Sequence, residues 1–205
     1  MNVGSNQGHA VHGPDPVILA ALLMMAFIGV GILHVWWLKS RLSTRFRIPL
    51  DAGKTFRGRR LLGDNKTVNG FVVLVPAAGM AFLGLSLLKP ILPAWWSEGV
   101  WPLSTGEYGL LGAWAGIGFM AGELPNSFLK RQCDIPPGAS PSTLWLKLAF
   151  MIFDRVDSIL GMLLALSLVV TVPPATWGYV LLFGPGLHFL FSASMYALRL
   201  KARAA

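Results

Sequence analysis

Long apolar blocks separated by short polar connections dominate the chain. Five blocks are long enough to form helices that cross a membrane, since about twenty helical residues span the ~30 Å hydrocarbon layer. They cover residues 17–38, 70–88, 108–129, 144–172 and 177–198. The fourth block exceeds the length of one span, so we expect it to be tilted, broken near Asp154 or partly outside the bilayer. The pattern predicts an all-α integral membrane protein with about five transmembrane helices.

Composition agrees with a chain embedded in a membrane. Of the 205 residues, 54% are hydrophobic and only 13% are charged, whereas soluble domains carry about a quarter charged residues. The length suits a single domain that covers residues 1–205. The single cysteine, Cys133, excludes an internal disulfide.

The basic residues predict how the chain lies in the membrane. Of the 17 Lys and Arg residues, nine lie between the first two blocks, three lie between residues 130 and 147, and three lie in the C-terminal tail. The opposite side carries only Lys89. Positively charged loops face the cytoplasm, so the N-terminus is predicted outside and the C-terminus inside. The protein is expected to be a multi-pass protein of the cytoplasmic (inner) membrane. The net charge of +8 comes from basic residues in the loops that flank the apolar blocks. This distribution is typical of membrane topology, so no nucleic-acid partner is expected.

The first basic cytoplasmic loop, 39–69, contains the stretch KTFRGRRLLGDNKT at residues 54–67. Gly58, Gly63 and the pair Asp64–Asn65 permit turns with positive φ. A turning backbone exposes N–H groups, which together with Lys and Arg side chains form a cradle for phosphate. The alternative is a loop that only fixes topology and touches anionic headgroups. The candidate substrate-binding residues in this loop are Lys54, Arg57, Arg59, Arg60, Asp64, Asn65 and Lys66. A second cytoplasmic loop is predicted at 130–143.

Carboxylates inside the apolar blocks indicate a site at bilayer depth. An unpaired charge there is costly, yet Glu123 lies in the third block and DRVDS, residues 154–158, lies in the fourth. In a helix, Asp154 and Asp157 share one face, and Ser158 joins them. Two close carboxylates are stable together when a cation bridges them or when one is protonated. Oxygen ligands suit Mg²⁺ or Mn²⁺.

Three other interpretations of these charges are open. Arg155 could neutralise one aspartate in a buried structural network. Glu123, Asp154 and Arg155 could instead form an ion or proton pathway in a small membrane transporter. A non-catalytic membrane scaffold would tolerate changes at both aspartates. The basic loop on the same side of the membrane favours a metal site that handles phosphates.

Two short motifs resemble a known superfamily. SFLKR at 127–131 followed by DRVDS at 154–158 is similar to the signature of the integral-membrane CTP:lipid-phosphate cytidylyltransferases, which include phosphatidate cytidylyltransferase. The loop KTFRGRRLLGDNKTVNG at 54–70, the short chain and the five spans resemble the CDP-archaeol synthase family more closely. The resemblance implies a single transmembrane catalytic domain. It would use CTP, with Mg²⁺, to convert a phosphatidate-like or archaetidate-like membrane lipid phosphate into a CDP-lipid and pyrophosphate.

Specific roles follow from this expected reaction. A lipid phosphomonoester has a second pKa of about 6, so it is largely dianionic at neutral pH and needs no general base. Positioning and charge stabilisation are what the protein must supply. Lys130 and Arg131 would bind the triphosphate, and Ser127 would hydrogen-bond a phosphate or orient a ligand. The expected catalytic residues are Ser127, Lys130, Arg131, Asp154 and Asp157; the expected metal ligands are Glu123, Asp154 and Asp157; Arg155 and Ser158 complete the expected substrate-binding residues.

Overall fold

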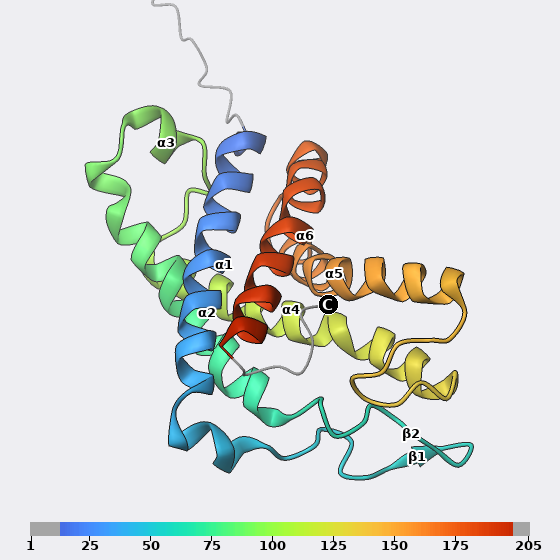
Figure 1. Ribbon diagram of the computed structural model, residues 1–205. Helices are drawn as coiled ribbons and strands as arrows, with labels where there is room; N and C mark the ends of the chain where they lie inside the picture. The colour runs from blue at the N-terminus through green and yellow to red at the C-terminus, as the bar shows by residue number, and fades with distance from the viewer. Residues whose placement is uncertain (1–12, 199–205) are drawn as a thin grey trace, which may run out of the picture.

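The computed structural model describes residues 13–198. The basic tail residues Arg199, Lys201 and Arg203 lie outside the described residues, as do the two chain ends whose sides of the membrane were predicted. The fold is mainly helical (Figure 1). In chain order its elements are α1 Pro16–Leu38, η1 Arg41–Phe46, β1 Thr55–Phe56, β2 Arg59–Arg60, α2 Val68–Leu88, η2 Lys89–Ile91, α3 Ala94–Glu98, α4 Thr105–Gln132, α5 Leu144–Ser167 and α6 Pro174–Ala197.

All five predicted apolar blocks form long helices. Within residues 13–198, three are long and apolar enough to cross a membrane: α1, α2 together with η2, and α6. The other two, α4 and α5, have similar length but carry ionisable residues. The chain is helical through Asp154, which excludes the break there that was one of three alternatives for the fourth block. The helix of the fourth block, α5, ends at Ser167 rather than at 172. β-branched residues and then Pro173 follow, and the residue before a proline disfavours helical backbone.

Local sequence explains where two of the helices begin. Asp15 precedes Pro16, and its side chain accepts hydrogen bonds from the N–H groups of Val17 and Ile18. Proline suits the first turn, where its missing N–H costs nothing. At the start of α4, Ser104 and Glu107 form a reciprocal capping box. These caps fix the ends of α1 and α4.

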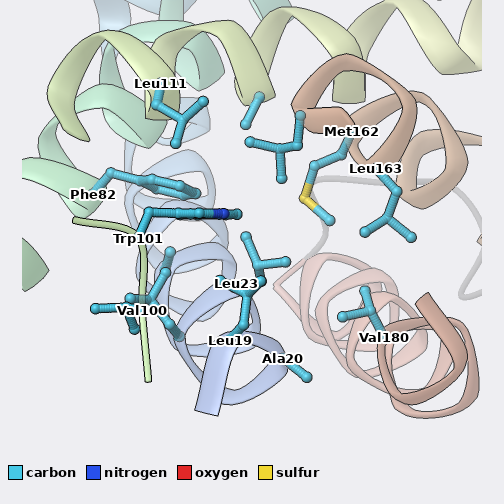
Figure 2. Close-up of a cluster of buried hydrophobic side chains, with 14 of the residues drawn as sticks. Leu19, Ala20, Leu23, Phe82, Val100, Trp101, Leu111, Met162, Leu163 and Val180 are labelled. Atoms are coloured by element: carbon cyan, nitrogen blue, oxygen red, sulfur yellow. The ribbon is translucent and has the colours of Figure 1, made fainter. Parts of the chain in front are cut away.

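Side chains from several helices meet in one buried cluster (Figure 2). Leu19 and Leu23 of α1, Phe82 of α2 and Leu163 of α5 are completely buried. On the outer faces, by contrast, large apolar side chains are exposed. A surface of this kind suits a protein that faces lipid, because hydrocarbon tails cover it.

Glycines allow the backbones of α4 and α5 to touch. A methyl group on Gly122 would collide with the carbonyl oxygen of Asp157, and one on Gly161 would collide with the carbonyl oxygen of Gly118. Small residues at helix crossings permit such an approach. The crossing places the residue after Gly122, which is Glu123, beside the aspartates of α5.

A two-stranded hairpin and an isolated antiparallel bridge between Pro49 and Thr67 depart from an all-α fold. Thr55 pairs with Arg60, and Phe56 pairs with Arg59. The turn residues Arg57 and Gly58 both have positive φ, at 52° and 77°, as tight hairpin turns require. Gly63 also has a positive φ, so the turns predicted at Gly58 and Gly63 are confirmed. In Figure 1 the hairpin lies near the C-terminal part of α4, at the opposite end of the molecule from α3.

Candidate active site

A cavity of about 490 Å³ opens between α1, α4, α5 and α6. Nine of the predicted site residues line it. Apolar side chains of α1 and α6, among them Phe27, Val180 and Phe191, line it as well. The predicted site residues on the wall are Asn65, Lys66, Glu123, Ser127, Lys130, Arg131, Asp154, Arg155 and Asp157.

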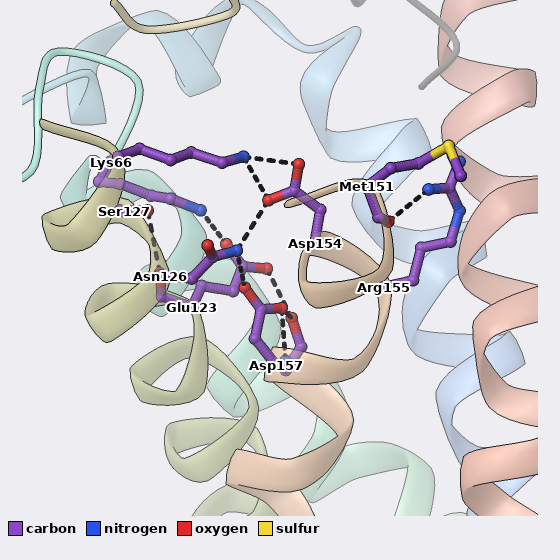
Figure 3. A network of polar contacts seen from close by, with 10 residues as sticks. Lys66, Glu123, Asn126, Ser127, Met151, Asp154, Arg155 and Asp157 are labelled. Atoms are coloured by element: carbon purple, nitrogen blue, oxygen red, sulfur yellow. Dashed lines mark hydrogen bonds and ion pairs between the residues drawn. The ribbon is translucent and has the colours of Figure 1, made fainter. Parts of the chain in front are cut away.

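The two aspartates of α5 meet at a single amide group. The side-chain nitrogen of Asn126 donates to Asp154 Oδ1 and to Asp157 Oδ2, each at 2.7 Å (Figure 3). The shared helical face predicted for these aspartates is therefore confirmed. Lys130, one turn along α4, donates to both carboxylate oxygens of Asp154. The carboxylates thus converge on donors from α4.

Glu123 links the basic loop to the same network. Its carboxylate accepts from the ammonium group of Lys66 and, through Oε1, from the hydroxyl of Ser158 at 2.9 Å. Burial opposes the charged form of Lys66, but the carboxylates of Glu123, Asp157 and Asp154 together outweigh burial and raise the pKa of Lys66 above its ordinary value. Ser158 does not line the cavity; it acts on the site through Glu123 and Asp157.

Arg131 is buried and only partly satisfied. Its side chain lines the cavity, and its residue exposure is 7%. Nε and Nη1 have no hydrogen-bond partner within the described part of the chain. A buried guanidinium with unpaired donors is costly, and an anion in the cavity would satisfy it. Ser127, by contrast, already donates to the carbonyl oxygen of Glu123 at 2.9 Å, so its hydroxyl proton is engaged within α4.

Arg155 does not neutralise an aspartate. Its guanidinium donates to the carbonyl oxygen of Met151 at 2.6 Å and lies over the ring of Phe189. Figure 3 shows it pointing away from Asp154 and Asp157. The structural network pairing Arg155 with an aspartate is therefore wrong, because lysines from other segments make the ion pairs with Asp154 and Glu123.

The rest of the basic loop has other contacts. Lys54, Arg57, Arg59, Arg60 and Asp64 were predicted to bind substrate, but none of them lines the cavity. Arg59 pairs with Asp134 of the second loop, Arg60 pairs with Asp64 and Asp51, and Arg57 lies over the ring of Phe56. Lys54 is exposed. In this structure, only Asn65 and Lys66 of the predicted loop residues reach the cavity wall.

Two important residues were missed by the sequence analysis. Asn126 directly precedes the SFLKR motif, and its position three residues after Glu123 and four before Lys130 would have placed it on their helical face. Asp51 precedes the basic stretch, and no motif or spacing in the sequence marks it as a site residue; it is only one acid among many bases. Its side chain is completely buried, and hydrogen bonds from Arg60 hold the pKa of this carboxyl well below its usual range.

The donor set fits a hard divalent cation. Asp154 and Asp157 offer oxygen atoms within 2.7 Å of one common atom, and the cavity also holds cationic groups for phosphate. Among residues 13–198, no three Asp, Glu, His or Cys side chains are grouped to hold an ion by themselves. Mg²⁺ is commonly bound by one or two carboxylates plus substrate phosphates and water, so two aspartates meet that need. The three-carboxylate set with Glu123 stays a prediction.

Comparison with known sequences shows which proteins the chain is similar to. A family model described as CarS-like, CDP-archaeol synthase, matches residues 45–204. The CDP-archaeol synthase of Methanopyrus kandleri is 33% identical over 156 residues, which cover 75% of this chain and 77% of that protein. The CDP-archaeol synthase of Halorubrum lacusprofundi is 34% identical over 160 residues, with coverage of 75% and 81%.

A solved structure shares the fold. It is described as an intramembrane enzyme for archaeal membrane lipids biosynthesis, and it superposes with a TM-score of 0.56 at 23% identity, covering 85% of this chain and 90% of that one. The chain is therefore a membrane-embedded, CTP-dependent cytidylyltransferase that makes a CDP-lipid. Within that class it belongs to the CDP-archaeol synthase family, which confirms the predicted family. The transporter interpretation is not favoured.

Proposed function

We propose that the lipid substrate is an archaeol-type phosphate with isoprenoid ether chains. The observation that carries this proposal is the cavity, whose wall combines charged side chains with apolar side chains of α1 and α6. The charged side chains suit phosphates, and the apolar side chains suit lipid chains. The names of the archaeal relatives support the choice of ether lipid over an acyl lipid.

The proposed reaction forms one phosphorus–oxygen bond and breaks another. An oxygen of the lipid phosphate attacks the α-phosphorus of CTP, and the bond from that phosphorus to the bridging oxygen breaks. The electron pair leaves with pyrophosphate. Since the lipid phosphate is already dianionic, no side chain needs to accept a proton. Arg131, Lys130 and Lys66 would contact phosphate oxygens and stabilise the charge on the leaving group.

We propose that Asp154 and Asp157 hold Mg²⁺, with Mn²⁺ as a substitute and Glu123 beside them. The ion would neutralise phosphate charge and orient the triphosphate. The oxygen-only donor set and the shared amide donor of the two aspartates support this assignment.

The test of the function is transfer of radiolabelled CTP to a panel of lipid phosphates. We expect the purified protein to label an isoprenoid-ether phosphate much faster than a diacyl phosphatidate of similar chain length. Faster labelling of the diacyl lipid would reject the ether-lipid assignment. No labelling with either lipid would reject the reaction.

We propose five spans in a cytoplasmic membrane, with the N-terminus outside and the loops 39–69 and 130–143 in the cytoplasm. Impermeant thiol labelling of intact cells tests this topology. Because Cys133 is exposed, it must first be replaced by Ser. In that background Glu98→Cys should react, since it lies in the 90–106 segment assigned to the outside, and Arg45→Cys should react only after lysis. Both sites are exposed. The opposite pattern would invert the orientation.

A further inference from the structure

Asp51 is an acidic residue at the centre of the basic loop, and its carboxylate is a hub of hydrogen bonds. It accepts from the backbone N–H groups of Gly53 at 3.1 Å and of Leu62 and Gly63 at 3.0 Å each. Arg60 adds two more bonds, from Nε at 3.2 Å and Nη2 at 2.7 Å. The loop N–H groups that were predicted to bind phosphate therefore bind an internal carboxylate.

This arrangement folds the loop back on itself. The N–H of Lys54 donates to the carbonyl oxygen of Asp51, and the N–H of Leu61 donates to that of Lys54. These two bonds bring the segment after β2 back beside Lys54 and Asp51. Gly63, which follows the hairpin, is held with a φ of 93°.

Gly63 in turn lies against the buried arginine of the cavity. A methyl group on Gly63 would lie 3.6 Å from Arg131 Cδ and 2.9 Å from Pro137 Cγ. The stem of Arg131 is thus enclosed between α4, the second loop and Gly63. The guanidinium at the end of this stem is the group whose Nε and Nη1 are unpaired.

We propose that Asp51 is a positioning residue for nucleotide binding. By holding Gly63 against the stem of Arg131, it keeps the guanidinium at the cavity wall, ready to bind the triphosphate. Asp51 does not line the cavity and acts through Gly63 and Arg131. The inference rests on the proposed function, since it assumes that Arg131 binds CTP.

The first experiment compares Asp51→Asn with Asp134→Asn. Both remove one carboxylate from an ion pair between an acid and a loop arginine, but Asp134 is exposed and pairs with Arg59 outside the cavity. We expect Asp51→Asn to raise the Kd and the KM for CTP about tenfold, by analogy with the loss of metal affinity when a partner that orients a metal ligand is removed. The kcat should change much less. Asp134→Asn should bind CTP as the wild type does.

A double-mutant cycle separates positioning from a general loss of loop structure. Arg131→Met alone should weaken CTP binding. If Asp51 acts through Arg131, adding Asp51→Asn to Arg131→Met should weaken it little further. Independent, additive effects on the Kd for CTP would overturn the inference.

A pair of glycine variants keeps the inference testable if Asp51→Asn does not fold. Gly58→Ala and Gly63→Ala both place alanine at a positive φ, yet nothing lies within 4 Å of the methyl position at Gly58. Only Gly63→Ala should raise the Kd for CTP. Equal Kd values for the two glycine variants would overturn the inference but leave the proposed function intact. A wild-type Kd for CTP in folded Asp51→Asn would do the same. A wild-type protein that binds no CTP in isothermal titration would overturn the proposed function as well.

Discussion

Asp157→Asn is expected to abolish CDP-lipid formation while leaving the protein folded. The substitution keeps the shape of the side chain but removes one of the two charges that converge on Asn126. A reaction without a general base depends on electrostatic stabilisation of the phosphates, so loss of a carboxylate that is proposed to hold the cation should have a severe effect. We expect Asp154→Asn to have the same effect.

The measurement is incorporation of radiolabelled CTP into the lipid phosphate, with thermal melting as the folding control. A chelator should abolish incorporation by the wild type, and added Mg²⁺ or Mn²⁺ should restore it. Asp134→Asn is the matched control, because it makes the same chemical change at an exposed ion pair. Wild-type incorporation by folded Asp154→Asn and Asp157→Asn proteins would reject both aspartates as metal ligands.

Parts of this site could be predicted from sequence where the residues concerned lie on a single helix. The i, i+3 spacing of Asp154 and Asp157 fixes their shared face whatever surrounds the helix. Apolar blocks likewise predict helices, because the backbone must satisfy its own hydrogen bonds in hydrocarbon. These inferences need no knowledge of which helix packs against which.

Contacts between distant segments could not be predicted in this way. Lys66 and Glu123 are 57 residues apart, and their ion pair depends on how the loop meets α4. The same holds for Asp51: a sequence shows an acid among bases, but only the fold shows that it occupies the N–H groups of the loop. The count of basic residues therefore overstated how many of them reach the cavity.

The second large effect is expected at Arg131. Arg131→Met should raise the Kd for CTP about 100-fold, because two unpaired donors, Nε and Nη1, are lost. Each hydrogen bond between charged groups contributes about 1.5 kcal/mol or more, and about 1.4 kcal/mol corresponds to a factor of ten in Kd. Arg131→Lys keeps the charge but lacks the planar fork of donors, so its Kd for CTP should lie between those of the wild type and Arg131→Met.

The same substitution should stabilise the protein in the absence of nucleotide. Methionine preserves an unbranched stem beside Gly63 and Pro137, and it removes a buried charge whose donors are unsatisfied. We therefore expect Arg131→Met to have a higher Tm than the wild type without CTP. At the same CTP concentration, CTP should then raise the Tm of the wild type more than that of the variant.

Such an opposite change in ligand binding and in stability would identify Arg131 as a binding group rather than a structural one. Arg45→Gln serves as the control, since Arg45 is exposed and does not line the cavity; its Tm and CTP affinity should match the wild type. A lower Tm for Arg131→Met with unchanged CTP affinity would show that the guanidinium supports the fold. The triphosphate contact would then have to be assigned to Lys66 and Lys130, the other two cations of the cavity proposed to contact phosphate.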